Sequence, residues 1–213
     1  SSSPTLNDYC IKLNKNSLST YVSSSINTDL FVPKNNYKND HKIVLGWTGT
    51  FSSIPFLESI KHVLIELNKV CDFKLRVISN CDFIADELDL ELISWTKEKE
   101  VEDLQGIDIG LYPLEDSEWV LGKSGLKALQ YMSFGIPTVA TSVGTSKIII
   151  QDNFNGFLVK NEEEWIKILK KLIEDASLRR RIGTEARKTI IDKYSKKVIK
   201  KIYLQILKNQ TKL

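Results

Sequence analysis

Short apolar runs alternate with longer amphipathic segments through most of the chain. The run at 43–47 is followed by a segment, 56–70, whose apolar positions recur with helical spacing. This alternation predicts parallel strands joined by right-handed crossovers, with helices on both faces of the sheet: a doubly wound α/β fold. Strands are expected at 43–47, 73–79, 88–94, 107–112, 138–141 and 156–159, and helices at 56–70, 98–104, 123–134, 162–176 and 178–194.

The two ends of the chain depart from this alternation. Residues 1–40 are predicted to form an interdomain linker with a helix at 4–15, a strand at 20–25 and a polar stretch from residue 27 onward. Residues 41–194 are predicted to form one Rossmann-like domain. A last amphipathic helix is expected over 195–213.

The charge of the chain is nearly balanced but unevenly distributed. Its 30 basic and 27 acidic residues give a net charge of +3, which does not indicate a nucleic-acid partner. Residues 160–213 carry 12 Lys and 4 Arg against 7 acidic residues. This basic region is typical of a solvated helix face, and peripheral contact with an anionic membrane is the alternative.

Three cysteines without CxxC spacing predict reduced thiols and no structural zinc site. No apolar run has the length of a membrane span, and the N-terminus lacks a signal-peptide pattern. We therefore expect a cytoplasmic protein, with the inner face of the membrane as the place of any peripheral contact.

Residues 122–140, GKSGLKALQYMSFGIPTVA, have the pattern of a phosphate-binding loop followed by a helix, a break and a buried strand. The first turn of a helix leaves N–H groups unpaired, and small residues let an anion approach them. Lys123 and Lys127 add charge to this turn. Solvent-facing lysines are the alternative interpretation. The small residues are Gly122, Ser124 and Gly125.

Gln130 lies about one turn beyond Lys127 on the same helix face. Its amide could reach the hydroxyls of a ribose or a sugar. The alternative is a helix-forming glutamine that faces water. For the tryptophans, packing is favoured over stacking against a ligand. These are Trp47, Trp95 and Trp119.

Three segments together resemble the C-terminal, donor-nucleotide domain of retaining GT-B glycosyltransferases of the glycogen-synthase-like group 1 family. SSSINTDLFVP (23–33) resembles the linker motif, and LGWTGTFSSIPFL (45–57) resembles the first strand and glycine loop of the donor domain. The third segment, 122–150 with NGFLV (155–159), resembles the E-x7-E signature region and its sequel. The resemblance implies the Rossmann-like half of a GT-B fold in an enzyme that builds bacterial polysaccharides or glycolipids.

The chain departs from the family pattern at the signature itself. Gly122 occupies the position of the first glutamate, and Gln130 that of the second, which binds the nucleotide ribose in the family. The basic residues that often follow the first glycine loop are also missing, since 50–55 contains none. Lys123 and Lys127 are the candidates to replace that charge.

The resemblance implies a UDP- or GDP-linked sugar donor, transfer with retention of anomeric configuration, and no metal or other cofactor. Helix N-terminal amides and lysines suit the charge of a diphosphate leaving group. Lys123 and Glu118 are the predicted catalytic residues, and Trp119 is expected to face the sugar. The predicted donor-binding residues are Gly49 and Thr50 with Lys123, Ser124, Gly125, Leu126 and Lys127 at the diphosphate, Gln130 at the ribose, and Ser94 and Trp95 near the base.

In such an enzyme the acceptor, a glycan or a lipid-linked glycan, binds mainly to the other half of the GT-B pair. The chain begins at Ser1 rather than Met. We therefore expect a fragment that binds donor but transfers no sugar alone, with its last helix crossing back to the N-terminal domain. The alternative function is a non-catalytic nucleotide-sugar-sensing module. A GT-B-type epimerase is disfavoured because His41 and His62 are the only histidines and neither follows a suitable strand.

Overall fold

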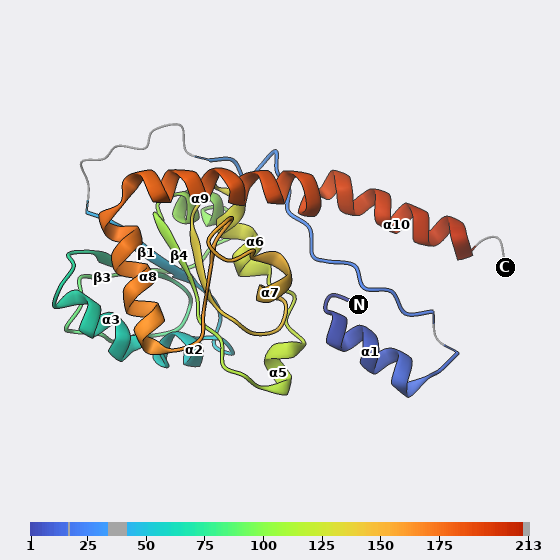
Figure 1. Cartoon of the computed structure of the whole chain (residues 1–213), viewed down its shortest axis with the longest axis horizontal. Coiled ribbons are helices and arrows are strands. Elements are labelled where there is room, and N and C mark those ends of the chain that lie inside the picture. The colour runs from blue at the N-terminus through green and yellow to red at the C-terminus, as the bar shows by residue number, and fades with distance from the viewer. Residues whose placement is uncertain (17, 34–41, 211–213) are drawn as a thin grey trace.

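The computed structural model describes residues 1–16, 18–33 and 42–210. Its centre is a six-stranded sheet, all parallel, with strand order β3-β2-β1-β4-β5-β6 (Figure 1). The predicted doubly wound α/β fold is confirmed, and each strand lies within or one residue beyond an expected apolar run. The strands are β1 (Val44–Thr48), β2 (Lys74–Ile78), β3 (Leu90–Ile93), β4 (Ile109–Tyr112), β5 (Thr138–Thr141) and β6 (Phe157–Val159).

Helices cover both faces of the sheet and enclose two apolar clusters. On one face α3 packs beside α8, where Leu64 and Leu169 are completely buried. On the other face α6 packs against α9, around Leu129 and Ile190. The helices of the domain are α2 (Ile54–Glu58), α3 (Lys61–Asn68), α4 (Glu100–Gln105), α5 (Glu118–Leu121), α6 (Leu126–Ser133), α7 (Ser146–Ile149), α8 (Glu162–Glu174), α9 (Ala176–Thr189) and the π-helix η1 (Ile190–Tyr194).

The strand order reverses between β1 and β4, which are hydrogen-bonded neighbours through Leu45–Ile109 and Gly46–Gly110. From β1 the chain winds outward through β2 to β3, and from β4 it winds the other way through β5 to β6. The loops that leave the carboxyl ends of β1 and β4 therefore diverge. In open α/β sheets a crevice for ligands forms at such a switch point.

Several expected elements differ in the structure. The helix at 56–70 is two helices, α2 and α3, because Ser59 donates its hydroxyl to the Phe56 carbonyl at 2.8 Å and closes a turn there. The helix expected from Lys123 begins at Leu126, since Gly125 before it has φ +74°. Short helices α5 and α7 lie in segments expected to be loops, and residues 190–194 form a π-helix instead of continuing α9.

The N-terminal segment contains the expected helix, α1 (Pro4–Leu13), but not the expected strand at 20–25. The Val22 N–H donates to the Ser1 carbonyl, outside any sheet, and only Ile26 forms a bridge, to Ser195. The polar stretch predicted after residue 27 falls partly on 34–41, outside the described residues.

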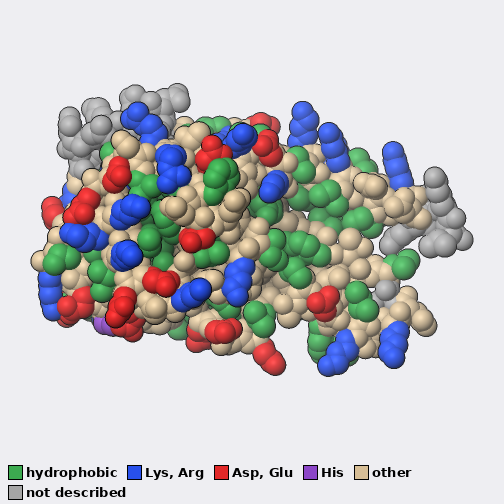
Figure 2. Space-filling view, in the orientation of Figure 1, with side chains coloured by type: hydrophobic (Ala, Val, Ile, Leu, Met, Phe, Trp, Pro, Cys, Tyr) green, Lys and Arg blue, Asp and Glu red, His purple; other side chains and the backbone are tan. Residues whose placement is uncertain are grey.

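The C-terminal helix α10 (Lys196–Gln210) runs well past the body of the domain toward the side where α1 lies (Figure 1). Hydrophobic side chains gather below α10 and on α1, while basic side chains project from the upper edge of α10 (Figure 2). Among the residues described, no helix combines the length and apolarity needed to cross a membrane. The exposed apolar residues of the two helices include Leu6, Tyr9, Leu13, Ile202, Tyr203, Leu204 and Leu207.

Candidate functional site

The switch point is bordered by the loop after β1, the segment after β4 and the start of α6, and the space between them is where a ligand crevice is expected in this fold. Tyr131 of α6 ties these parts together, because its hydroxyl accepts a hydrogen bond from the Thr48 N–H at 2.9 Å. Complete burial raises the pKa of Tyr131, so the phenol stays protonated. The carboxyl end of β1 is thereby fixed against the helix whose N-terminus faces the crevice.

The glycine loop after β1 uses its own backbone donors. The Gly49 N–H donates to the Ile78 carbonyl of β2 at 3.1 Å, and the Thr50 N–H donates to Ser53 Oγ at 3.0 Å. A Cβ on Gly49 would lie 2.3 Å from Cη2 of Trp47, so packing alone requires a glycine there. Because these amides are already hydrogen-bonded, the exposed polar groups of the loop are hydroxyls. Thr50 Oγ1 lies 3.2 Å from Ser52 Oγ.

Free backbone donors gather at the start of α6. The N–H groups of residues 124–128 have no acceptor within the described part of the chain. Gly125 adopts φ +74° as the N-cap, and Thr145 fixes the preceding loop by donating its hydroxyl to the Lys123 carbonyl at 2.8 Å. Unpaired N–H groups together with the positive end of the helix dipole form a site for an anion.

This site starts two residues later than the sequence suggested. The N–H groups of Gly122 and Lys123 close the last turn of α5, donating to the carbonyls of Trp119 at 3.2 Å and Val120 at 3.0 Å. Neither amide is free for a ligand. The predicted backbone contribution of Ser124, by contrast, is compatible with the geometry.

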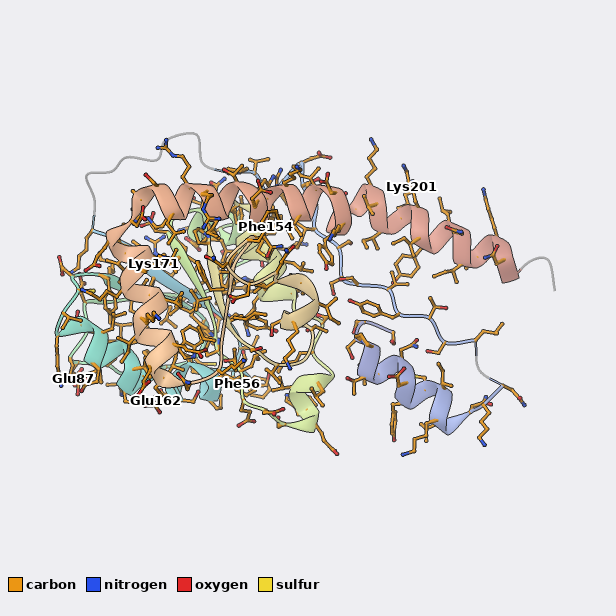
Figure 3. All side chains as sticks on the ribbon, viewed as in Figure 1. Phe56, Glu87, Phe154, Glu162, Lys171 and Lys201 are labelled. Carbon is orange, nitrogen blue, oxygen red and sulfur yellow. The ribbon has the colours of Figure 1, made fainter. Side chains whose placement is uncertain are left out.

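Lys123 and Lys127 lie over aromatic rings beside these amides. Nζ of Lys123 is 5.1 Å from the centre of the Phe56 ring, labelled in Figure 3, and 5.4 Å from that of Trp119. Nζ of Lys127 is 5.1 Å from the Trp47 ring. Distances below about 6 Å allow cation–π attraction, which steers both ammonium groups toward the crevice walls.

Neither lysine has a carboxylate within ion-pair distance among the residues described. Burial lowers the pKa of Lys123, and burial with the nearby charge of Lys123 lowers the pKa of Lys127 to about 8. Two neighbouring, partly buried cations without an acid are costly to keep in a fold. Together with the free amides, the two ammonium groups supply the charge and the hydrogen-bond donors that suit an anion.

The alternative interpretation expected Gln130 to face water, but the structure buries it. It is 9% exposed, and its Nε2 donates to Oε1 of Glu100 at 3.0 Å. Glu100 is the first residue of α4. Sequence reasoning missed it because a glutamate in the first turn of a helix is explained by the helix dipole alone.

The other predicted site residues lie at the rim. Ser94 and Trp95 follow edge strand β3, and both are exposed. Glu118 and Trp119 begin α5 and are also exposed, Trp119 to 65%. Trp47 is 1% exposed and is packed in the core, whereas Trp95 is 39% and Trp119 65% exposed, so neither of these two is a core residue.

The described histidine lies away from the crevice. His62 is in α3 and contacts Glu162 at 2.8 Å, on the face where α3 meets α8. His41 is outside the described residues. Nor do the described residues contain a group of three or more His, Cys, Asp or Glu side chains able to hold a metal ion.

Solved structures share this fold. The C-terminal domain of a glycosyl transferase group 1 family protein (LpcC) from Francisella tularensis is 22% identical with a TM-score of 0.65, over 80% of this chain and 99% of that one. Sucrose-phosphate synthase from Thermosynechococcus elongatus is 14% identical (TM-score 0.76; 98% and 57% covered). Anabaena Alr3699/HepE, solved with UDP and glucose, is 15% identical (TM-score 0.75; 100% and 62% covered).

The chain thus shares the Rossmann-like α/β fold of these solved structures, and it spans about 60% of the length of the latter two proteins. Residues 90–189 match the family described as "Glycosyl transferases group 1". The matched segment, which is less than half of the chain, includes α4 and α6 with Lys123, Lys127 and Gln130. No curated protein matches the sequence.

Proposed function

We propose that this chain is the donor-binding half of a retaining, metal-independent glycosyltransferase that uses a UDP- or GDP-linked hexose. The observation that carries the proposal is the pair of lysines, Lys123 and Lys127. They lie beside the free amides of residues 124–128, and the described residues provide them with no acidic partner. A diphosphate matches this arrangement in charge and in its number of acceptor oxygens.

The reaction needs charge stabilisation mainly on one side of the scissile bond. The bond between the sugar's anomeric carbon and the diphosphate oxygen breaks, and the diphosphate leaves with the electron pair. The acceptor hydroxyl oxygen bonds to the anomeric carbon on the same face and gives its proton to the departing diphosphate oxygen. Ammonium groups and amides fixed around the leaving group stabilise the charge that develops there. Glu118 and Trp119, at the rim of the crevice, are proposed to contact the sugar.

The acceptor is proposed to be a glycan or lipid-linked glycan, bound largely by a second, N-terminal domain to which α10 crosses. The exposed apolar residues of α10 and α1 support this arrangement (Figure 2). A cytoplasmic location and contact between the basic C-terminal region and an anionic membrane stay predictions from the sequence.

Isothermal titration calorimetry of this chain with UDP, GDP and their sugars tests the donor site. We expect binding that weakens about tenfold or more in Lys123→Ala and in Lys127→Ala, because each removes a charged contact to phosphate. Lys167→Ala is the matched control, since Lys167 is exposed on α8, on the other face. Flat heats for every nucleotide at millimolar concentration would contradict the proposal.

A nucleotide-sugar-sensing module is the second candidate, favoured by the absence of both signature glutamates at Gly122 and Gln130. It would bind the same ligands. Sugar transfer by a longer protein that joins this chain to an acceptor domain separates the two candidates. An enzyme would lose transfer in Lys123→Ala, whereas a sensor would show none before the substitution.

A further inference from the structure

The contact between Gln130 and Glu100 joins two elements far apart in sequence. Gln130 lies in the second turn of α6, and Glu100 begins α4 after the loop that leaves β3. In parallel α/β units a helix starts at the edge of the sheet where the preceding strand ends. Both residues therefore lie at the ligand-binding edge.

The contact leaves part of the carboxylate available. Gln130 donates to Oε1 of Glu100, while Oε2 has no hydrogen-bond or ion-pair partner among the described residues. Gln130 is buried and Glu100 is half-buried. A buried amide thus holds a charged carboxylate in one orientation, with one oxygen free to accept from a ligand.

The neighbourhood of this free oxygen indicates which ligand group it faces. Lys127, at the phosphate end, is three residues before Gln130, about 4.5 Å along the helix axis. In the chain, Glu100 begins α4 directly after the β3–α4 connection, which carries Ser94 and Trp95, the predicted base contacts. A group between the diphosphate and the base of a nucleotide is its ribose.

We propose that the Glu100 carboxylate, positioned by the Gln130 amide, accepts hydrogen bonds from the ribose hydroxyls of the donor nucleotide. The inference rests on the proposed donor site and deepens it. A carboxylate that accepts from ribose hydroxyls is a recurrent device in nucleotide-binding folds. Gln130 itself carries no charge, and α4 brings a carboxylate to 3.0 Å from its amide nitrogen. Glu100 is then a specificity-determining residue and Gln130 a positioning residue.

The test compares ribose recognition with diphosphate recognition in this chain. UDP, GDP, their 2′,3′-dideoxy analogues and inorganic pyrophosphate are titrated by calorimetry into the unsubstituted chain and into Glu100→Ala. We expect the unsubstituted chain to bind each ribonucleotide about tenfold or more tightly than its dideoxy analogue, since a carboxylate acceptor is involved. In Glu100→Ala this preference should disappear, while pyrophosphate affinity stays within about twofold.

Two further variants separate charge at this position from charge in general. Glu98→Gln removes one nearby exposed carboxylate that has no hydrogen bond or ion pair with the described residues, and it should keep the preference for ribose. Gln130→Leu removes the positioning amide and should reduce the preference without affecting pyrophosphate. Circular dichroism of each variant at the titration temperature establishes that it is folded.

The outcomes distinguish this inference from the proposed function. Binding of UDP or GDP with an undiminished preference for ribose in a folded Glu100→Ala would overturn the role of Glu100 and leave the donor site standing. Absence of binding by every nucleotide and by pyrophosphate would overturn both. Loss of the preference in Glu98→Gln as strongly as in Glu100→Ala would also overturn the inference, because the effect would then be one of net charge.

Discussion

Nζ of Lys127 lies 5.1 Å from the ring centre of Trp47, so a cation of α6 contacts the aromatic residue of strand β1. Trp47 is 1% exposed, and its ring removes Lys127 from water on one side. The π-face compensates only part of the lost hydration, because cation–π attraction contributes about 0.5–2 kcal/mol. The remaining cost explains why the pKa of Lys127 falls from 10.5 to about 8.

Nucleotide affinity should therefore depend on pH. A diphosphate stabilises the protonated lysine. The protein should therefore bind the diphosphate strongly at pH values below 8 and progressively more weakly above pH 8, as Lys127 loses its proton. Between pH 7 and pH 9 the protonated fraction falls about tenfold, and the affinity for UDP or GDP should fall by a similar factor. Calorimetry at half-unit steps measures this.

The control for the pH series is Lys127→Met, which keeps the length of the apolar stem. This variant should bind more weakly at pH 7 and show a much flatter dependence between pH 7 and 9. An unchanged slope in the variant would assign the pH dependence to another group, with Lys123 the next to test because burial also lowers its pKa.

Removing the buried charge should stabilise the unliganded fold. The folded-state pKa of Lys127 is below its unfolded value of 10.5, so between pH 8 and 10.5 the unfolded chain binds more protons. The stability cost is fully present below pH 8 and fades as pH rises toward 10.5. Lys127→Met should therefore be more stable at pH 7 by about 1–3 kcal/mol.

The measurement is urea denaturation of both proteins at pH 7 and pH 10. The advantage of Lys127→Met should shrink at pH 10, because the folded lysine is then neutral and most of the cost of burying an ammonium group is gone. A variant that is less stable than the unsubstituted chain at pH 7 would show that packing or an unseen counter-charge outweighs burial of the ammonium group.

Gly125 should be irreplaceable, whereas Gly122 should not. At Gly125 φ is +74° and a Cβ would lie 2.3 Å from Cδ1 of Ile149, so Gly125→Ala should cost about 1–3 kcal/mol and misplace the free amides of α6. At Gly122 φ is −78° and the nearest atom is 3.4 Å away, the Trp119 carbonyl oxygen. Gly122→Ala is therefore the matched control, expected within about 0.5 kcal/mol of the unsubstituted chain.

Thermal or urea unfolding of the two variants, followed by UDP titration, checks this pair. Gly125→Ala should lose affinity even where it is folded, because the N-cap conformation places the amides of residues 124–128. Equal stabilities for the two alanine variants would contradict the conformational argument. A stable Gly125→Ala with full affinity would contradict the assignment of those amides to the anion site.

The strands of the sheet and the pairing of Lys123 with Lys127 could be predicted from the sequence, because both depend on local features of the chain. Buried parallel strands are apolar on both faces, so runs such as 107–112 are visible without tertiary information. The identity and spacing of Lys123 and Lys127 are likewise local properties. The start of α6, by contrast, depends on the positive φ of Gly125, and a glycine does not reveal which conformation it adopts.

Glu100 could not be found in the same way. Its position depends on a tertiary contact between α4 and α6, a hydrogen bond between residues thirty positions apart. Gly49 and Thr50 are predicted to lie at the diphosphate, but their N–H groups donate to Ile78 and Ser53. These contacts depend on the pairing of β1 with β2 and on the local turn. Contacts made by tertiary packing are what the sequence pattern omits.

The pairing of Gln130 with Glu100 can be tested by exchanging the two side chains. Gln130→Glu places a second carboxylate about where the amide is now, facing Glu100 at 3.0 Å. Like charges this close in a half-buried site should destabilise the fold by about 1–3 kcal/mol at pH 7. The loss should diminish as the pH falls and one of the two carboxylates takes up a proton, since their shared pKa is raised.

The double variant Glu100→Gln/Gln130→Glu restores one amide and one carboxylate in reversed positions. Its stability should return to within about 1 kcal/mol of the unsubstituted chain, which identifies the contact as a specific pair. Urea denaturation of the two single variants and the double variant at pH 7 closes the cycle. Additive losses in the double variant would show that the residues act independently. With a carboxylate still present at the crevice, the exchanged pair should also keep part of the preference for ribose that Glu100→Ala loses.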